Sequence, residues 1–573
     1  MQREIWRPTL KHDSSTGVHF IVAHERESRS LVSRPIWASV EHPRLETRMV
    51  TVHEWLRECD AEHPGCKAQS SLSQKSVLPM RLLDVNQNGS IEYMVLVRTG
   101  TVRESLKYLA LSHCWGNDHM PMRTTKQNVV DHENGLRINS LPRTFRDAVI
   151  ITRLLGYKYI WIDSLCIVQD DQNDWEREAS KMASIFHCAD IVLSAASARN
   201  SSEGCGIDKC LEPATNFFFP SQLDYKYDTL AQTYGGPRKR LFIRRGGITS
   251  NGIEGCPVQK RGWILQEILL AQRVLYFVNG DMIWQCHHLV QSEDGQLSRA
   301  QTSSIFSCHY GGNLSNAPLY NLEKRLQIGR EVHLWWDILR DFFQRKFTKS
   351  EDTLPSLAGL IDIWRGYTND DSVLGLWKKD LPFHLCWFVG SSLSIVDRVP
   401  AQPSWCWTSV SQANRPILQH ASWDYVSSED VVWQAGIKNV DIQWEGRPLL
   451  SRPKRATLSL YRVRATRGAL YQAISYLLDN EEEKEFKHPE TVQIIPLIIT
   501  KPSSATSKRT GGARFHMHSL LLERINLIDG QVRYRRKGYA DFVSRLDCKD
   551  SDIDARVKEI ISGIEEIDII DIV

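Results

Sequence analysis

The sequence predicts an α/β protein whose core is a flavodoxin-like, three-layer domain with a parallel sheet. A mainly helical region and a β-rich C-terminal region follow this core. The first observation is the alternation of short apolar runs at 108–112, 159–162 and 191–196 with amphipathic stretches of helical spacing. Strand–helix–strand repeats of this length favour parallel crossovers. The second observation is that polar side chains follow these runs, where an open α/β sheet holds its ligands.

The chain has 573 residues, which is too long for a single hydrophobic core. Changes of pattern along it predict several parts. These are an N-terminal extension (1–80), the α/β domain (81–290, with core motifs at 108–204 completed by 260–286), a mainly helical region (291–440), and a β-rich region with an acidic helical tail (441–573).

Composition narrows the classes of function. The chain is 42% hydrophobic and 24% charged with a net charge of +3, so we expect neither a nucleic-acid nor a membrane partner. Thirteen cysteines lie outside any disulfide-framework spacing, and the first ten residues are polar and charged. We therefore expect reduced thiols and a cytoplasmic location.

Local patterns predict individual elements. Two Asn-Gly pairs, Asn88-Gly89 and Asn279-Gly280, predict turns of β-hairpins. The polar stretch 163–173 predicts a loop, and the apolar stripe from Trp175 to Phe186 predicts one helix capped by Asp174. Further helices are expected over 354–364, 374–388 and the tail 549–573.

The segment 51–66 predicts a helix with Trp55, Leu56 and Cys59 on one face. Cys59, His63 and Cys66 could provide three metal ligands. A structural zinc ion usually has four ligands, and the sequence shows no obvious fourth. We therefore interpret the segment as a short surface helix with incidental thiols, and predict no metal site.

Five motifs of the chain together resemble a known family. They read YLALSHCWG, LPRTFRDAV, YIWIDSLCIVQDD, DWEREASKM, and RGWILQEILLAQRVLYF with IWQC, and they begin at Tyr108. In order and spacing they resemble the fungal heterokaryon-incompatibility (HET) domain, and with downstream motifs the resemblance covers roughly residues 50–410. His113 stands where the family usually has Tyr, and Cys406 where it usually has Ser. The resemblance implies a cytosolic fungal protein of self/non-self recognition whose activation triggers programmed cell death.

HET domains are in turn distantly similar to TIR domains, some of which cleave NAD at the nicotinamide–ribose bond with a helical glutamate. The resemblance makes Glu178 the catalytic candidate and NAD a possible substrate, with no cofactor. A carboxylate there would stabilise an oxocarbenium-like state. The alternative is an exposed Glu178 paired with Lys181 at i+3. If Glu178 is buried against Lys181 with no cleft beside Ser112 and Trp115, the enzymatic interpretation fails.

Asp163, at the end of a predicted strand, is the second catalytic candidate, and its alternative is a loop cap. The remaining candidates line the same crevice or come from the R-x-W-x-x-Q-E motif. They are Ser112, Cys114, Trp115, Gly116, Cys166, Gln169, Arg261, Trp263 and Glu267. Trp115 could stack on a nicotinamide or adenine ring, or serve as a core residue. Arg261 could pair with Asp163 or Glu178, and Trp263 could simply pack onto the sheet.

Other chemistries need different residues. A cysteine nucleophile would combine Cys114 or Cys166 with His113 or His119, although thiols at strand ends usually serve packing. A zinc site from Cys114, His113 and His119 is a weaker alternative. The acidic run Asp170, Asp171 and Asp174 could bind a cation, but such a run more often forms a solvated loop and helix cap.

Two functions remain open. The first is a death effector that cleaves NAD or a related nucleotide through Glu178. The second is a non-enzymatic module that acts by self-association, with a homo-oligomer or an incompatibility partner protein as its partner. The chain has no G-x-x-x-x-G-K-[ST] loop, so it lacks a P-loop nucleotide engine.

Overall fold

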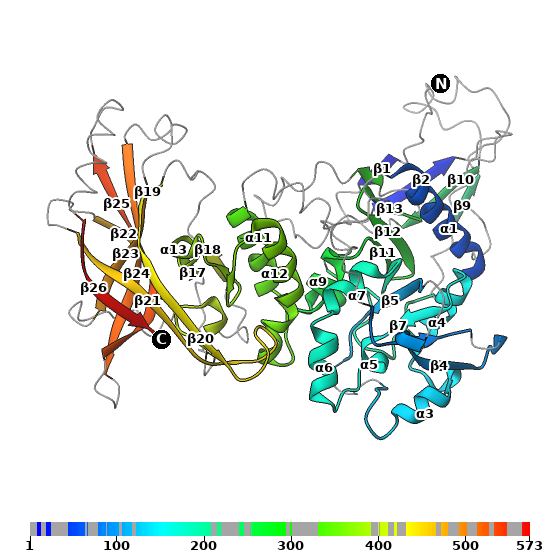
Figure 1. Cartoon of the computed structure of the whole chain (residues 1–573). Coiled ribbons are helices and arrows are strands. Elements are labelled where there is room, and N and C mark those ends of the chain that lie inside the picture. The colour runs from blue at the N-terminus through cyan, green and yellow to red at the C-terminus, as the bar shows by residue number, and fades with distance from the viewer. Residues whose placement is uncertain are drawn as a thin grey trace, which may run out of the picture. The chain divides into compact units, whose positions relative to one another are not determined.

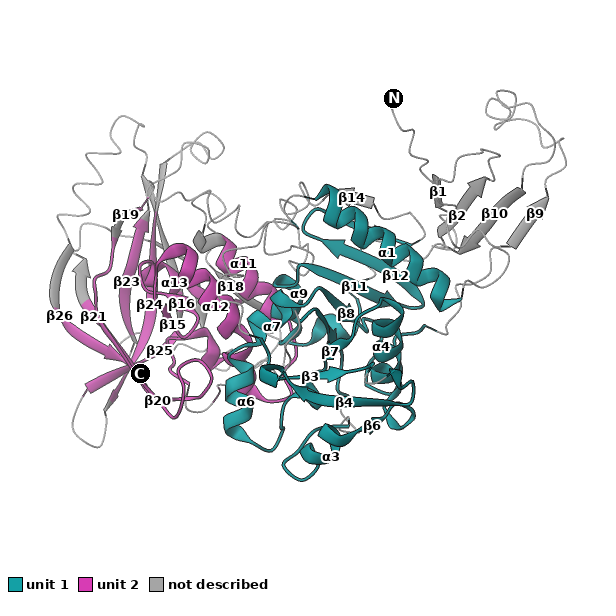
Figure 2. Cartoon of the chain, turned by 45° about the vertical axis from the view of Figure 1, so that its right-hand side comes forward, with its two compact units in different colours: residues 1–322 teal, residues 323–573 magenta. Residues whose placement is uncertain are grey.

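The structure is a computed structural model of the whole chain (Figure 1). It describes residues 9–12, 19–24, 44–63, 66, 78–86, 89–101, 106–116, 122–207, 215–218, 240–245, 253, 255–293, 298–300, 331–390, 399, 402–410, 417–420, 431–465, 472–478, 492–500, 513–526, 532–546 and 564–573. The chain divides into two compact units, residues 1–322 and 323–573 (Figure 2). No helix within these described ranges is long and apolar enough to cross a membrane.

Unit 1 is built on a ten-stranded sheet of order β14-β13-β12-β11-β8-β5-β7-β3-β4-β6. Its strands are β3 (Arg81–Asp84), β4 (Tyr93–Arg98), β5 (Tyr108–Ser112), β6 (Leu136–Arg137), β7 (Tyr159–Trp161), β8 (Ile191–Ser194), β11 (Arg273–Val278), β12 (Asp281–Cys286), β13 (Leu289–Ser292) and β14 (Ser298–Ala300). A second, four-stranded sheet contains β1 (Thr9–His12), β2 (His19–His24), β10 (Arg240–Arg245) and β9 (Thr215–Phe218) in that order.

The centre of the large sheet is parallel and its flanks are antiparallel. Strand β5 pairs in parallel with both β7 and β8, and β11 pairs in parallel with β8. Strands β3, β4 and β6 on one side, and β12, β13 and β14 on the other, pair antiparallel. The prediction of a parallel sheet is therefore correct for the centre and wrong for the whole, because hairpins extend both edges. The burial of every residue of β5, β7 and β8 fits a sheet covered on both faces.

Helices lie on both sides of this sheet. They are α1 (Leu45–Glu62), α3 (Val129–Asn134), α4 (Arg143–Leu154), α5 (Asp163–Cys166), α6 (Gln172–Ala179), α7 (Met182–Cys188) and α9 (Ile264–Leu269). Figures 1 and 2 show α6, α7 and α9 on one side and α1 with α4 on the other. Because β7 and β8 flank β5 on opposite sides, the crossovers through α4 and through α6–α7 reach opposite faces.

Both predicted hairpins of unit 1 are present. Strands β11 and β12 pair in register around Asn279-Gly280, and both turn residues have positive φ (51° and 97°), as a two-residue type I′ turn requires. Strands β3 and β4 also pair antiparallel. Gly89 has a φ of 72°, while Asn88 lies outside the described residues.

Two local predictions in this unit are wrong. The expected single helix from Asp174 to Phe186 is two helices, α6 and α7, which separate at Ser180 and Lys181. The expected loop 163–173 begins with the short helix α5. The break turns the apolar residues of α7 toward β5, where the Tyr108 hydroxyl donates to the Ile185 carbonyl at 2.7 Å.

Unit 2 begins with the helices α11 (Glu331–Phe343), α12 (Pro355–Thr368) and α13 (Leu381–His384). Two small sheets accompany them, β15 (Ser372–Val373) with β16 (Leu376–Trp377), and β17 (Trp387–Gly390) with β18 (Ile417–His420). The helix predicted over 354–364 is therefore present within α12. The helix predicted over 374–388 is limited to the four residues of α13, because Leu374 and Gly375 have positive φ and turn the chain between β15 and β16.

The C-terminal region is β-rich, as predicted. Its strands are β19 (Val431–Gln434), β20 (Ile437–Trp444), β21 (Pro453–Ala465), β22 (Gln472–Leu478), β23 (Val492–Thr500), β24 (Ala513–Asn526), β25 (Val532–Leu546) and β26 (Ile564–Ile572). The main sheet has the order β19-β23-β24-β25-β26-β21-β20, and β22 pairs with β25.

The predicted acidic helical tail is wrong over its described part. Residues 564–572 form β26, which lies between β25 and β21 in the sheet. Ile570 and Ile572 are buried on one face, and Asp571 between them accepts a hydrogen bond from Ser459 at 2.6 Å. The alternation of apolar and acidic residues has period two here, and pairing with β21 decides between strand and helix.

Candidate functional site

The residues that the sequence predicted to line a crevice include several at the carboxyl ends of the parallel strands, and we call this end of the sheet the predicted crevice. Ser112 and Ser194 end β5 and β8 and are partners in the parallel register. Both are fully buried, and neither hydroxyl has a hydrogen-bond partner within the described residues. Strand β5 lies between β7 and β8, which both follow it in the chain, so the strand order reverses at β5. In open α/β sheets, ligands bind beyond the carboxyl ends of the strands at such a point.

Asp163 is the carboxylate that follows β7 at this end of the sheet. Its Oδ2 accepts a hydrogen bond from the Trp115 indole Nε1 at 2.8 Å, and its Oδ1 accepts one from the Ser164 backbone N–H at 2.7 Å. The Asp163 side chain keeps 20% of its surface exposed. It therefore combines the predicted role of a cap with access to solvent, and it fixes the orientation of the Trp115 ring.

His113 lies behind Asp163, with its Nδ1 3.9 Å from the Asp163 Oδ1. Burial lowers the pKa of His113 to about 4, and Arg261 lowers it further while Asp163 opposes the shift. The imidazole is therefore neutral near pH 7 and does not act as a general acid there. Arg261 donates from Nη1 to the His113 carbonyl, which joins the segment before α9 to the loop after β5.

The thiols of the crevice are poor nucleophiles in this environment. Burial raises the pKa of Cys114 to about 11, although Arg261 opposes the shift. Burial also raises the pKa of Cys166, which is fully buried. Both side chains are thus protonated near neutral pH, and the reactive form of cysteine is the thiolate. His119 of the proposed Cys/His pair and zinc site lies outside the described residues.

Glu178 occupies a different environment from Asp163. Its side chain is 0% exposed, and Lys181 Nζ donates to its Oε1 at 3.0 Å. The backbone N–H of Met80, just before β3, donates to its Oε2 at 2.9 Å. The expected exposed pair with Lys181 exists, but it is buried. Both carboxylate oxygens are engaged by the protein, which weighs against a direct contact between Glu178 and a substrate.

The remaining candidates shape the crevice in different ways. Gly116 has a φ of 92°, a conformation that favours glycine after the Trp115 turn. The Gln169 side-chain amide donates to the Asp163 carbonyl at 3.1 Å and closes the loop after α5. Trp263 precedes α9 as its N-cap residue, packs against the hydrophobic core, and meets Trp175 of α6 edge-to-face with centroids 6.3 Å apart. Glu267 is buried on α9.

Of the acidic residues at the start of α6, one caps the helix as expected and another is buried instead of solvated. Asp171 is the N-cap and accepts from the Asn173 N–H at 3.1 Å. Asp174 is instead buried and receives two hydrogen bonds from Arg81 of β3, at 2.9 and 3.0 Å. The predicted cap therefore lies three residues too late. No local pattern indicated this partner, because Arg81 is 93 positions away from Asp174.

A group of thiols outside the crevice also differs from expectation. Cys59, His63 and Cys66 are all buried, so these side chains lie on the inner face of α1 and just beyond its end rather than at the surface. Cys286, the last residue of β12, lies with them. Sequence reasoning missed it because it is far along the chain, although the IWQC motif had already singled it out.

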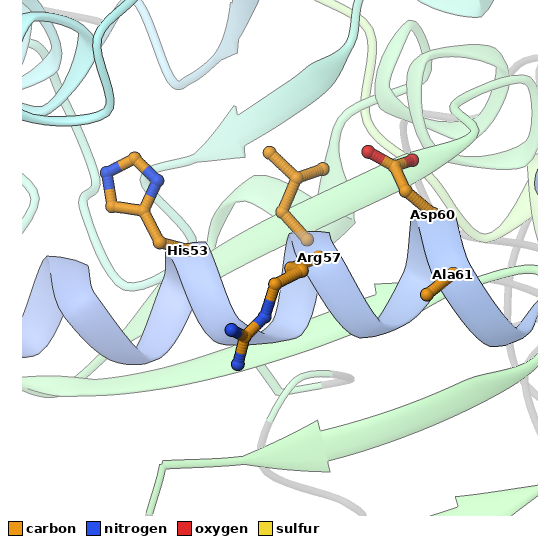
Figure 3. A pocket seen from close by; sticks show the side chains of 5 residues that line it. His53, Arg57, Asp60 and Ala61 are labelled. Carbon is orange, nitrogen blue, oxygen red and sulfur yellow. The ribbon is translucent and has the colours of Figure 1, made fainter.

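A shallow hollow lies on the solvent side of α1 (Figure 3). All five of its lining residues come from this one helix, and none is a predicted site residue. They are His53, Leu56, Arg57, Asp60 and Ala61. Figure 3 shows the His53 and Asp60 side chains on one side of the helix and Arg57 on the other, so they do not converge on a common point.

The fold and the crevice together define an α/β protein with a polar, aromatic-lined site at the ends of its central parallel strands. Residues 108–267 match the family model described as Heterokaryon incompatibility protein (HET). The matched stretch is thus similar to the HET family, and it includes the strands β5, β7 and β8 with the loops described above. No curated protein and no solved structure matches the chain.

Proposed function

We propose that this protein acts in heterokaryon incompatibility, in self/non-self recognition that leads to programmed cell death in a fungus. In this proposal the HET domain is a cytoplasmic, TIR-like signalling module. It works without catalysis, by self-association or by binding an incompatibility partner protein. The match of residues 108–267 to the HET family supports the general role.

The burial of Glu178 supports the non-enzymatic form of this proposal. A TIR-like cleavage of NAD needs a carboxylate next to the anomeric carbon, where it stabilises positive charge in the transition state. Glu178 has no exposed surface, and both its oxygens accept hydrogen bonds from the protein. A substrate would reach this carboxylate only after α6 had moved away from β3.

A second candidate is cleavage of NAD or a related nucleotide with Asp163 as the essential carboxylate. The specific observation in its favour is that Asp163 keeps 20% of its side-chain surface exposed and holds the Trp115 indole beside it. The indole would offer a nicotinamide or adenine ring a stacking surface. In this version Arg261 and Gln169 position the loops and do not touch the reacting bond.

The experiment measures cellular NAD and cell viability in a fungal host that expresses the full chain, alone or fused to an inducible dimerising domain. Asp163→Asn, Glu178→Gln and the matched control Glu176→Gln on the same helix are compared with the wild type. Equal amounts of soluble protein are verified for each variant, so that loss of folding is not mistaken for loss of activity.

The outcomes separate the two candidates. Cell death on forced assembly without a fall in NAD supports the module that acts by association. A fall in NAD that Asp163→Asn abolishes, while both glutamate variants retain it, establishes the second candidate. A fall in NAD that only Glu178→Gln abolishes, with the variant folded, refutes the structural assignment of Glu178.

A further inference from the structure

Four potential metal ligands meet on the side of unit 1 that carries α1. They are Cys59 and His63 at the end of α1, Cys66, and Cys286 at the end of β12. Their ligand atoms all lie within 4.8 Å of one another, and all four side chains are buried. Figures 1 and 2 show α1 alongside β12, and Trp55 of α1 meets Trp284 of β12 at a centroid distance of 6.2 Å.

The spacing of these atoms fits a tetrahedral metal site. Zinc–sulfur bonds of about 2.3 Å and zinc–nitrogen bonds of about 2.0 Å place neighbouring ligand atoms roughly 3.5–4 Å apart. The Cys286 Sγ lies 3.5 Å from the His63 Nδ1, within that range. Three thiols and one imidazole form a soft donor set that suits zinc better than calcium or magnesium, which prefer oxygen ligands.

Hydrogen-bond donors next to the four residues would stabilise cysteine side chains in the thiolate form. Three thiolates and one zinc ion would leave a net charge of about −1 in a buried environment. Arg273 of β11 is buried beside them, and its Nε donates to the Cys59 Sγ at 3.4 Å. The His288 backbone N–H donates to the Cys286 Sγ, also at 3.4 Å. Such hydrogen bonds orient and stabilise metal-bound thiolates.

The histidine is held in one orientation. The His63 ring stacks on the His288 ring with centroids 4.4 Å apart, and its Nδ1 faces Cys286. The backbone supports the same geometry, because the Cys66 N–H donates to the His63 carbonyl at 3.0 Å. His63 would therefore bind a metal through Nδ1.

We propose that Cys59, His63, Cys66 and Cys286 bind one zinc ion in a closed, four-coordinate structural site. With all four positions filled by protein, the ion has no open position for a substrate. Its role is to join α1 to β12. These elements lie before and after the stretch 108–267 that matches the HET family, so the zinc ion would link the two flanks of the HET domain.

The test begins with the metal content of the full chain, purified under reducing conditions without chelators. We expect about one zinc ion per chain by mass spectrometry of the metal. Exchange for cobalt(II) is expected to give the intense d–d bands of a tetrahedral site and a thiolate-to-cobalt charge-transfer band. This measurement needs no variant and reports the ligand set directly.

Cys286→Ser is the informative variant, because this residue alone connects the distant strand to the cluster. We expect it to retain less than a tenth of the wild-type zinc and to lose the thiolate–cobalt band. Cys256→Ser is the matched control, since Cys256 is also buried in unit 1 but lies outside the cluster. It is expected to bind zinc like the wild type.

Three results would overturn the proposal. One is a folded, reduced wild-type chain that contains no zinc and shows no thiolate–cobalt band. Another is a Cys286→Ser chain that keeps stoichiometric zinc. The third is a disulfide between two of the three cysteines in protein isolated with its thiols trapped at lysis.

Discussion

Replacing Glu178 should mainly lower the stability of unit 1, because its carboxylate is bound by the protein. Its carboxylate is fully buried and accepts hydrogen bonds from Lys181 and from the Met80 N–H, at 3.0 and 2.9 Å. Glu178→Ala leaves the Lys181 ammonium, whose side chain is 19% exposed, without its partner and the Met80 N–H unsatisfied. Breaking a buried ion pair by removing one partner costs about 3–5 kcal/mol. Some screening at Lys181 places the expected loss near the lower end, at about 3 kcal/mol.

The assay is thermal unfolding of the full chain, followed by proteolysis at each temperature and detection of fragments from unit 1, because tryptophans occur in both units. For a domain of this size about 3 kcal/mol corresponds to a fall in Tm of roughly 6–12 °C. Glu178→Gln keeps the size of the side chain and can still accept from Met80, so it should lose less. Lys181→Met leaves the buried carboxylate unpaired and should be destabilised like Glu178→Ala. An unchanged Tm for Glu178→Ala would refute the structural role and return Glu178 to the list of functional residues.

Three other changes test the geometry. Asp174→Asn should lower the free energy of unfolding by about 3 kcal/mol, because the buried Arg81 guanidinium then faces a neutral amide instead of a carboxylate. In the wild type, burial raises the pKa of Asp174, but hydrogen bonds from Arg81 and other donors lower it by more, so the pKa lies below its ordinary 3.8. The ion pair of Asp174 with Arg81 therefore stabilises the fold fully above about pH 4, and this contribution is lost as the pH falls through the lower pKa of the folded state. Melting curves from pH 7 to pH 3 should therefore show a smaller acid-side loss for Asp174→Asn. Trp115→Phe should lose about 1.5 kcal/mol with its bond to Asp163, and an unaltered Tm would contradict that contact. Ile572→Asp should expose unit 2 to limited proteolysis while unit 1 persists, because Ile572 is fully buried in the sheet.

Local sequence signals were sufficient for the central strands and the hairpins. Apolar runs predicted β5, β7 and β8, and the positive φ angles of Asn279 and Gly280 are those that Asn-Gly turns require. The polar residues after β5 and β7 do meet, as Trp115 and Asp163 show. These predictions succeeded because each depends on residues that are close in sequence, or on a general property of parallel sheets.

The errors arose where distant partners decide the structure. The tail 564–572 has isoleucines compatible with a helix, but pairing with β21 makes it a strand. The group of Cys59, His63 and Cys66 lacked Cys286 in the sequence analysis, because Cys286 comes from a hairpin far along the chain. The antiparallel flanks of the sheet were missed for the same reason, since the hairpins were predicted but not their attachment to the parallel centre.

Asp174 and Glu178 on α6 were candidates for cation binding and catalysis, but their position on the helix gives both a structural role. They are four residues apart, so they share one face of the helix, and that face is turned toward β3. Asp174 binds Arg81, the first residue of β3, and Glu178 binds the Met80 N–H just before it. Two carboxylates thus fix a short, otherwise polar helix to a strand on the antiparallel flank of the sheet. Removing two charges from water is costly, so both must be paired, and paired carboxylates are poorly placed to act on a substrate. Asp163 also accepts two hydrogen bonds, from the Trp115 indole and the Ser164 N–H, but neither donor is charged and its side chain keeps 20% of its surface exposed. Access to solvent is therefore what distinguishes Asp163 from Asp174 and Glu178.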